Sequence, residues 1–493
     1  MHAATSLHPR PFARLLSLIL LLLPLLPGAI TAKDALQPPP ASLPVAASHQ
    51  SVSRAVVART LTEDEVWSVE TPRHQILDTG DATRTVMLAP VAPNSLPPGT
   101  WFAARVTTRN GNRILFRRSD GELLAFWGSN EASQTKWITL TATDAGWEAR
   151  VSSGKALSHA DPALAFLGAD LRPSDDFVRP ASARTNGYAI RFGTDSPLLY
   201  VSCRANHPRF RVIADGRLVA DIDVDDTSGT RLLLPVELGD TKPKKIEILA
   251  DALEFGSVEV PDVRTQLHAW PAAVPAVRML WIGDSSAELG THAYPWLAGN
   301  LLGYEVWSRS WGHHAQHVAG ANRNAPPLAA IDEDVAAVNL DVIVISGHFF
   351  DEQLSPRAYT AVVGAWFDAI ARASRPESVK IALSAWVNRG PVDRLSDRRA
   401  SIIAREASRR DFHYVNWQAW IDGNRDDASW GNAHEIISAN YIHYTSLGNA
   451  YIADCFAGQV QRLRLERKAQ LAAASRRQAA ADARNIAVAE AGP

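Results

Sequence analysis

The 493-residue sequence is poor in sulfur, with two cysteines and three methionines. Cys203 and Cys455 lie far apart, and two cysteines are too few for a disulfide-stapled scaffold or a cysteine-rich metal site. An excess of either charge is also missing, since 50 Lys and Arg face 52 Asp and Glu, for a net charge of −2. The sequence therefore lacks the single-sign field of a nucleic-acid-binding protein, and we expect no nucleic-acid partner.

Several cofactor motifs are missing as well. The sequence contains no phosphate-binding glycine-rich loop and no dinucleotide fingerprint. His313 and His317 have the i, i+4 spacing of helix-borne metal ligands, but they lack the Glu of a His-Glu-x-x-His pattern. We interpret them as histidines at the rim of a cleft, with a metal site as the alternative. The sequence thus predicts no cofactor and no metal.

Both ends of the chain differ in composition from the middle. Residues 1–32 resemble a signal peptide, because Arg10 and Arg14 precede an apolar run, 15–26, that is shorter than the roughly 20 residues of a membrane span. We predict a periplasmic or secreted protein without stable membrane insertion after signal removal; an uncleaved anchor is the alternative. Residues 33–60 form a Pro/Ala-rich linker. Residues 466–493 are a low-complexity tail, which we expect to extend the last helix into solvent; a basic partner-binding tail is the alternative.

Residues 61–265 are predicted to be β-rich. Short apolar-alternating runs recur between turn signals, and Asp215-Gly216 between two such runs is typical of a hairpin. Many short strands of this kind favour a β-sandwich or jelly-roll-like region, as one module or as two divided near residue 175. The expected strands are 100–107, 113–117, 123–127, 136–141, 187–192, 198–203, 210–214, 231–236 and 245–250.

Residues 276–465 follow a different rhythm, in which apolar strands alternate with helices. This order predicts right-handed βαβ units and a parallel sheet, with functional groups at the carboxyl ends of the strands. We expect strands at 277–282, 340–346, 380–386 and 412–417. We expect helices at 287–302, 358–373, 396–409 and 447–465.

The first of these strands leads into Gly283-Asp284-Ser285. The glycine permits a tight turn, and a serine at the start of the following helix would expose its oxygen next to backbone N–H groups. An N-capping Asp-Ser pair is the alternative interpretation. His443 stands just before the last helix, where the chain can fold back over the first strand, and it is the candidate general base for Ser285.

These two elements, in this order, resemble the SGNH hydrolases, also called GDSL esterases and lipases. The family has a flavodoxin-like three-layer α/β domain, and the resemblance covers residues 276–465. It implies that Ser285 is the nucleophile, that His443 is the base, and that the backbone N–H groups of Ser285 and Gly312 form the oxyanion hole. Gly312 ends a segment, Trp307 to Gly312, that looks like the second block of the family. With a β-rich region in front, the architecture is similar to two-domain bacterial carbohydrate acetyl esterases.

The sequence departs from the family pattern at two positions. The third block usually supplies an Asn as an oxyanion donor, but either way of anchoring the block here places Phe349 or Phe350 at that position, with His348 as a possible substitute. The usual Asp three residues before the histidine is Asn440. Loss of an oxyanion donor costs about 10²–10³ in rate, and Asn in place of the triad Asp costs about 10⁴ in serine proteases.

We therefore interpret the chain as an exported serine esterase of the SGNH type that removes O-acetyl groups from a carbohydrate. The catalytic residues are Ser285, His443 and Asn440, and the residues expected to contact an acylated carbohydrate or other ester substrate are Trp311, His348, Phe349 and Phe350. Three alternatives stay open: an inactive glycan-binding protein, an O-acyltransferase and a lipid esterase. The sequence gives no indication of the oligomeric state.

Overall fold

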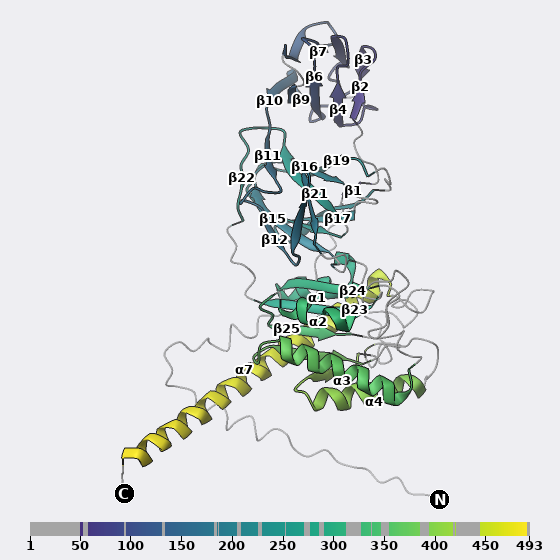
Figure 1. Cartoon of the computed structure of the whole chain (residues 1–493). Coiled ribbons are helices and arrows are strands. Elements are labelled where there is room, and N and C mark those ends of the chain that lie inside the picture. Colours follow the sequence, from purple (N-terminus) through teal and green to yellow (C-terminus); the bar gives the residue numbers. More distant parts are fainter. Residues whose placement is uncertain are drawn as a thin grey trace, which may run out of the picture. The chain divides into compact units, whose positions relative to one another are not determined.

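The strands form two pairs of sheets before residue 270 and one parallel sheet after it (Figure 1). The computed structural model describes residues 50–52, 58–92, 95–130, 134–181, 185, 187–204, 209–224, 229–251, 253–270, 277–284, 290–311, 327–336, 338–346, 354–384, 394–417, 420 and 444–490.

The first β region, residues 58–152, consists of two sheets that share one hydrophobic core. Trp67 from one sheet lies against Phe102 of the other at a ring-centroid distance of 5.2 Å. The five-stranded sheet runs β10 (Gly146–Ser152), β9 (Gln134–Thr143), β6 (Trp101–Thr108), β4 (His74–Asp78) and β2 (Ala58–Thr60). The four-stranded sheet runs β3 (Glu65–Trp67), β5 (Arg84–Leu88), β7 (Arg113–Arg118) and β8 (Leu123–Gly128).

The second β region comprises β1 and residues 155–268, again as two sheets around a common core. One sheet runs β1 (Gln50–Val52), β18 (Arg217–Asp223), β17 (Arg209–Ala214), β20 (Lys244–Ala250), β15 (Tyr188–Thr194) and β12 (Ala165–Leu167), with β22 (Leu267–His268) also on β15. The other runs β13 (Leu171–Ser174), β14 (Phe177–Pro180), β21 (Glu254–Val260), β16 (Leu198–Arg204) and β19 (Leu232–Glu237), with β11 (Lys155–Ser158) also on β21. Because β1 pairs with β18, the first β region is inserted in sequence between two strands of the second.

The segment predicted to be a linker, residues 33–60, contains two short strands near its end. These are β1, on β18, and β2, on β4. Both join the edge of a sheet, where backbone hydrogen bonds to one neighbour are enough to hold a strand without a strong apolar pattern.

The structure shows what two of the turn signals in the sequence form. The hairpin predicted at Asp215-Gly216 is confirmed: β17 and β18 are antiparallel, and the two turn residues have φ of 49° and 79°, as a two-residue hairpin turn requires. The signals near residue 175 belong to another hairpin, in which Ser174 pairs with Phe177 within one sheet. The change from the first pair of sheets to the second falls between β10 and β11 instead.

The α/β domain, residues 278–490, is built on a five-stranded sheet whose strands are all parallel. Its order is β24 (Glu305–Trp311), β23 (Arg278–Asp284), β25 (Val342–Ile345), β26 (Val379–Leu383) and β27 (His413–Val415). Counted in chain order, this is the 2-1-3-4-5 order of flavodoxin-like sheets, in which ligands bind at the carboxyl ends of the first and third strands.

Helices cover both faces of this sheet, so the domain has three layers. Alternate residues of β23 point to opposite faces: Trp281 packs in one core and Ile282 in the other. The first core contains α1 (Tyr294–Leu302) and the start of α7 (Ser446–Glu490). The second contains α2 (Pro327–Ala336), α3 (Pro356–Ala373) and α4 (Arg394–Ser408).

The sequence misplaced the start of one helix in this domain and missed two elements, α2 and β24. The helix expected over 287–302 begins only at Tyr294, after the short 3₁₀ turn η2 (Gly290–His292). Pro295 explains this, because proline lacks an N–H group and fits only the first turn of a helix. The strand β24 was not predicted, because Ser308, Arg309 and Ser310 break its apolar pattern although all three are buried.

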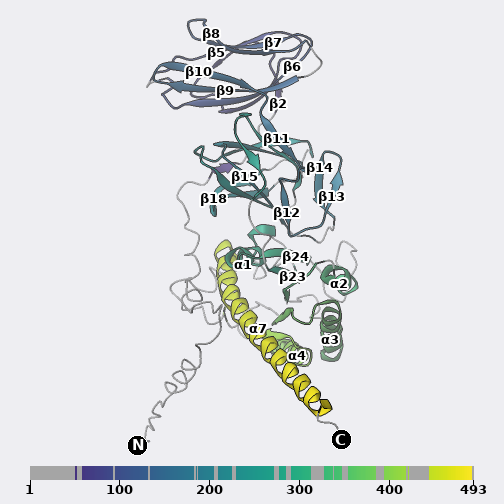
Figure 2. The same cartoon turned by 90° about the vertical axis from the view of Figure 1, so that its left-hand side faces the viewer.

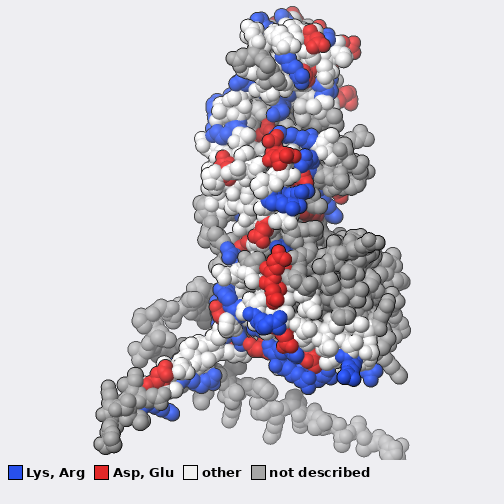
Figure 3. Space-filling model, in the orientation of Figure 1, with Lys and Arg blue, Asp and Glu red and all other residues white. Residues whose placement is uncertain are grey.

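The last helix, α7, begins at Ser446 and continues to Glu490, so the low-complexity tail extends the helix predicted over 447–465, as expected (Figure 2). Its residues up to Leu463 contribute to the core, whereas those after 466 are largely exposed. No helix among the described residues is both long and apolar enough to cross a membrane. On the face shown in Figure 3, acidic and basic side chains are interspersed, in keeping with the small net charge.

Candidate functional site

The carboxyl ends of the two neighbouring strands β23 and β24 lie side by side in register. Asp284, the last residue of β23, pairs with Trp311, the last residue of β24. The next residues in the sequence are Ser285 and Gly312, the predicted nucleophile and oxyanion donor. Because parallel strands end at the same edge of a sheet, both segments leave the sheet from adjacent points. The register therefore places the last described residue before each of the two sequence blocks at neighbouring points of the sheet.

The third strand of the sheet in chain order, β25, lies on the other side of β23 and ends at the same edge. Ile345 pairs with Ile282, and the Ser346 N–H donates to the Ile282 carbonyl at 2.9 Å. The Trp281 indole N–H donates to the Ser346 hydroxyl, also at 2.9 Å, and both side chains are buried. This contact fixes the point at which the chain leaves β25 toward His348, and it lies at the topological switch point of the sheet.

Asn449 fixes the start of α7 at the same edge. Its side chain is 3% exposed, and its Oδ1 accepts the N–H of Tyr294, the first residue of α1, at 3.0 Å. Its Nδ2 donates to the carbonyl of Thr445 at 3.1 Å. One buried amide thus joins the segment that follows His443 in sequence to the helix that follows β23 and η2.

Aromatic rings pack beneath this edge. Tyr294 has edge-on contacts with Trp281, Trp417 and Tyr444, at centroid distances of 5.0, 5.6 and 5.6 Å. All four rings are buried. Edge-to-face packing of this kind contributes beyond the area that it buries, so Tyr444 and the first turn of α1 are held against the sheet.

The second β region holds η2, which follows the Ser285 loop in sequence. Asp251 accepts both the backbone N–H of Thr291, at 2.5 Å, and its hydroxyl, at 2.6 Å. The Arg211 guanidinium donates to the backbone carbonyl of Thr291. Gly290 has φ of 60°, and a Cβ there would overlap Asp251. The turn before α1 is therefore shaped by side chains from outside the α/β domain.

These contacts form a small charged cluster. His292 Nε2 lies 3.5 Å from Asp221 and its Nδ1 lies 3.4 Å from Asp251. The nearby His292 ring lowers the pKa of the Asp221 carboxyl from its ordinary value. Burial lowers the pKa of the Arg211 guanidinium, although Asp251 and Asp221 oppose that effect.

Arg309 in β24 forms a second polar contact between the α/β domain and the second β region. It forms an ion pair with Asp334 of α2 at 3.4 Å, and both side chains are buried, at 3% and 5% exposed. It also donates to the Thr185 hydroxyl of the second β region at 2.6 Å. Because a buried charge is costly without a partner, this pair holds the end of β24, just before Gly312, in one position.

The structure leaves most predicted site residues untested. Seven of them lie outside the described residues: Ser285, Gly312, His348, Phe349, Phe350, Asn440 and His443. Trp311 is described only as the last residue of β24. Among the described side chains, no group of three His, Cys, Asp or Glu is placed to hold a metal ion.

Sequence reasoning missed the residues that position these segments: Asp251, Arg309 and Asn449. For Asn449 the sequence showed only that it stands in the first turn of the last helix, where polar side chains are common. For Asp251 and Arg309 there was no local signal, since their partners lie 40 and 25 or more residues away.

Comparisons with known proteins agree with this fold. No protein-family model and no curated protein matches the chain. Among solved structures, the salicylyl-acyltransferase SsfX3 of a tetracycline biosynthetic pathway is 17% identical, with a TM-score of 0.50 over 64% of this chain and 99% of that one. A family two carbohydrate esterase from Cellvibrio japonicus is 12% identical, covering 63% and 98%, with a TM-score of 0.49. A GDSL-like lipase from Bacteroides ovatus is 13% identical, covering 63% and 98%, with a TM-score of 0.48.

The resemblance that the motifs indicated is thus confirmed at the level of the fold. The chain is similar to a group of structures that includes carbohydrate esterases, an acyltransferase and a GDSL-like lipase. Residues 276–493 make up less than half of the chain, so a match over 64% of it extends into the β-rich part. Because one fold hosts many activities, the chemistry has to be argued from the site.

Proposed function

We propose that this protein is an exported serine esterase of the SGNH type that removes O-acetyl groups from a carbohydrate. The observation that carries the proposal is the register of Asp284 with Trp311, the residues that come directly before Ser285 and Gly312 in sequence. The switch point beside β25, and the Asn449 contact that ties the start of α7 to α1, support the same assignment. The two pairs of sheets are consistent with β-sandwich or jelly-roll-like modules in front of the catalytic domain.

The proposed reaction proceeds in two halves. The Ser285 hydroxyl oxygen attacks the acetyl carbonyl carbon while His443 accepts the hydroxyl proton, and the backbone N–H groups of Ser285 and Gly312 donate to the oxyanion. Collapse of the intermediate breaks the ester bond, and the leaving sugar oxygen takes the proton from His443. Water then attacks the acetyl-enzyme with His443 as base, which releases acetate and restores Ser285.

The two departures from the family predict an attenuated site. Asn440 provides no carboxylate for the second nitrogen of His443, and Phe349 or Phe350 provides no oxyanion donor. If the site is an attenuated triad, Asn440→Asp raises the rate, as does Asn at the phenylalanine that lines the acyl pocket. The matched control is Asn339→Asp, at an exposed position before β25; a gain in that variant would assign the effect to charge alone.

Acyl transfer is the second candidate, and the likeness to an acyltransferase at a TM-score of 0.50 favours keeping it. In that reaction a sugar hydroxyl, instead of water, attacks the acyl-enzyme. A fluorogenic acetyl ester incubated with and without cellobiose distinguishes the two, because transfer produces acetylated cellobiose and hydrolysis produces acetate.

The decisive experiment measures hydrolysis of 4-methylumbelliferyl acetate by the protein without residues 1–32. We expect Ser285→Ala and His443→Ala each to reduce kcat by about 10³ or more. Ser475→Ala, at an exposed serine of α7, leaves the rate unchanged. Activity that survives Ser285→Ala would refute the mechanism. An inert protein that binds glycans would support a binding protein instead, and a preference for long acyl chains a lipid esterase.

Export is tested separately. Expression of the full chain in a bacterial host, followed by fractionation and N-terminal sequencing, is expected to give a periplasmic or secreted protein that begins near residue 33. A full-length protein in the membrane fraction would support an uncleaved anchor instead.

The buried amide of Asn449 provides a test of positioning. Asn449→Ala leaves the Tyr294 N–H without its acceptor, and we expect kcat to fall by roughly tenfold or more because the start of α7, which follows His443 in sequence, loses its link to α1. Asn449→Asp keeps the acceptor and restores part of the rate. A structural effect alone would lower the melting temperature equally in both variants without this difference in kcat.

A further inference from the structure

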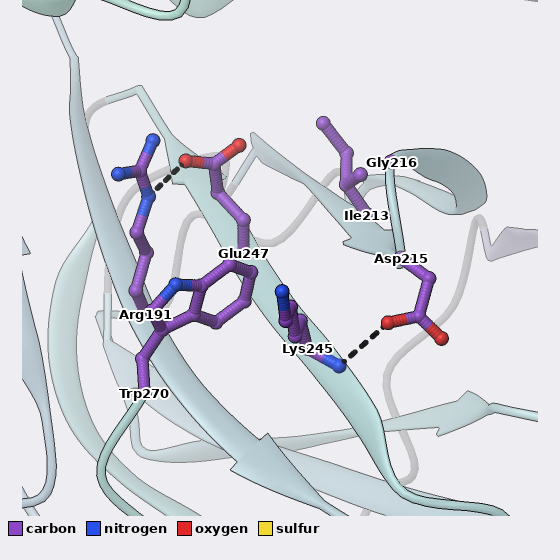
Figure 4. A pocket seen from close by; sticks show the side chains of 7 residues that line it. All are labelled: Arg191, Ile213, Asp215, Gly216, Lys245, Glu247 and Trp270. Carbon is purple, nitrogen blue, oxygen red and sulfur yellow. Dashed lines mark hydrogen bonds and ion pairs between the residues drawn. The ribbon is translucent and has the colours of Figure 1, made fainter. Parts of the chain in front are cut away.

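The second β region carries a pocket that takes no part in the site described above. Its volume is about 370 Å³, within the range of small-molecule pockets. Figure 4 shows its lining, which combines one aromatic ring, two cations and two carboxylates. The lining residues are Arg191, Ile213, Asp215, Gly216, Lys245, Glu247 and Trp270.

The register of two strands explains why these side chains meet. Arg191 of β15 pairs directly with Glu247 of β20, and Lys245 lies two residues before Glu247, so the three share one face of the sheet. The residues between them, Phe192 and Ile246, are buried in the core on the opposite face. The pocket therefore lies on the outward face of the sheet.

Trp270 provides the apolar surface of the pocket. It follows β22 in sequence and is half-buried. Its ring lies between Arg191 and Lys245, whose cationic groups are 5.9 and 5.7 Å from the ring centroid (Figure 4). The cations hold the ring in place at the edge of the pocket.

The charges of the pocket balance. The Arg191 guanidinium is hydrogen-bonded to the Glu247 carboxylate at 2.5 Å. The Asp215 carboxylate accepts the backbone N–H of Lys245 at 2.9 Å, and the Lys245 ammonium has no carboxylate within ion-pair distance among the described residues. Two cations and two anions leave no net charge for an ionic ligand, yet they supply donors and acceptors at close spacing.

We propose that this pocket binds a neutral sugar residue. The apolar C–H face of a pyranose packs on the Trp270 indole, and its hydroxyls exchange hydrogen bonds with the Lys245 ammonium and the Glu247 carboxylate. The site is non-catalytic, because every lining residue belongs to the second β region or to the segment just after it. It binds whether or not the chain is an esterase.

The pocket is continuous with the surface that contacts the α/β domain. Along the same two strands, the next outward pair after Arg191 and Glu247 is Ala189 and Leu249, which belong to the buried cluster of that domain. Ile213, at the edge of the pocket, packs against the same cluster. A sugar bound here thus lies on the face of the sheet that adjoins the catalytic domain, which suits a site that retains a polymer near it.

Binding is tested by isothermal titration calorimetry of the protein without residues 1–32, using cellohexaose, xylohexaose, mannohexaose and chitohexaose as probes. At least one is expected to bind, and Trp270→Ala raises its Kd at least tenfold. The matched control is Trp127→Ala, since Trp127 also lies at a half-buried position beside a lysine. Lys245→Met, which keeps the side-chain stem, weakens binding several-fold, whereas the exposed Lys242→Met does not.

Two further experiments distinguish the proposed sugar site from the proposed esterase activity. Ser285→Ala binds the probe as the unchanged protein does, and Trp270→Ala hydrolyses 4-methylumbelliferyl acetate at an unchanged rate. Insoluble cellulose, xylan and mannan in pull-down assays show whether the site takes a polymer or only a free oligosaccharide. The proposal is overturned if no probe binds at millimolar concentration, if Trp270→Ala binds as tightly as Trp127→Ala, or if only an anionic polymer such as polygalacturonate is retained. A thermal melt with an unchanged midpoint shows that each variant is folded.

Discussion

The second β region contacts the first β region and the α/β domain through two junctions that differ in their apolar content. Toward the first β region, the shared apolar cluster is small and includes Trp137 and Tyr200, whose tilted rings have a centroid distance of 4.3 Å. Toward the α/β domain, Ala189 and Leu249 belong to the main core of that domain, together with Trp296. The first junction joins two separate cores, whereas the second extends one core across both regions.

The backbones also approach more closely at the second junction. Gly168 has φ of 83°, and a Cβ there would overlap both the Val306 carbonyl and the Trp296 ring. Its N–H donates to the buried Glu305 carboxylate at 3.3 Å. Such contact requires that the two surfaces form together, so we infer that the second β region and the α/β domain unfold as one cooperative unit, with the first β region as a separate one.

The largest expected effect tests this inference directly. Trp296→Ala removes a side chain that is 2% exposed, and we expect the free energy of unfolding of the joint unit to fall by about 3–5 kcal/mol. Hydrogen exchange should increase in β15 and β20 as well as in β23 and α1, with β6 and β7 unchanged. The matched variant Phe116→Ala, in the core of the first β region, should show the reverse pattern. If both variants destabilise all three regions equally, the difference between the junctions is not real.

A smaller effect is expected from the polar part of the second junction. Asp251→Ala leaves the fully buried Thr291 N–H without its acceptor, which costs about 1–3 kcal/mol. Because η2 follows the Ser285 loop in sequence, the rate of acetyl-ester hydrolysis should fall as well. Asp64→Ala also removes an acceptor from one backbone N–H, that of Thr85, but at an exposed position of the first β region. A rate unchanged by Asp251→Ala would show that the junction is not coupled to the site.

The smallest effect is a dependence on pH that both junctions share. The His292 ring lowers the pKa of Asp221 at the second junction, and the His74 ring lowers that of Glu237 at the first. A carboxyl with a lowered pKa stabilises the fold above its unfolded pKa, about 3.9 for Asp and 4.3 for Glu, and this contribution is lost as the pH falls through the folded value. Both carboxylates are more than one-third exposed, so solvent reduces the effect.

Melting temperatures between pH 3 and pH 6 measure this contribution. His292→Gln should flatten the acid limb of the joint unit alone, whereas His74→Gln should flatten the limbs of both units, because its partner Glu237 lies in the second β region. A flattening of the limb of the first β region by His292→Gln would again indicate a single cooperative unit.

Much of the secondary structure could be read from local sequence patterns. The runs around Arg113 and Leu198 alternate or stay apolar over the length of a strand, and both form strands within a residue or two of the expected bounds. The Asp215-Gly216 turn was predictable because few residue pairs adopt two successive positive φ angles. The strand β24 was hidden because its buried Arg309 is paired with Asp334, a tertiary partner that no local pattern reveals.

The candidate site also combines features that the sequence predicted with features that only the structure shows. The order of strands and helices, together with Gly283-Asp284-Ser285 and the His443 segment, was sufficient to predict which segments belong to the site. It did not reveal that the first turn of α7 is tied to α1 through Asn449, or that a carboxylate of the second β region binds Thr291.

The sequence by itself determined what depends on neighbours along the chain: the alternation of strands, the hairpin turn, the parallel βαβ order and the residue types of the candidate triad. Only the tertiary structure decided the insertion of the first β region after β1, the sharing of one core between the second β region and the α/β domain, and the pocket around Trp270. The physical reason is range: backbone propensity and hydrophobic period act over a few residues, whereas strand register and shared cores join residues far apart in sequence, whose contact no local pattern encodes.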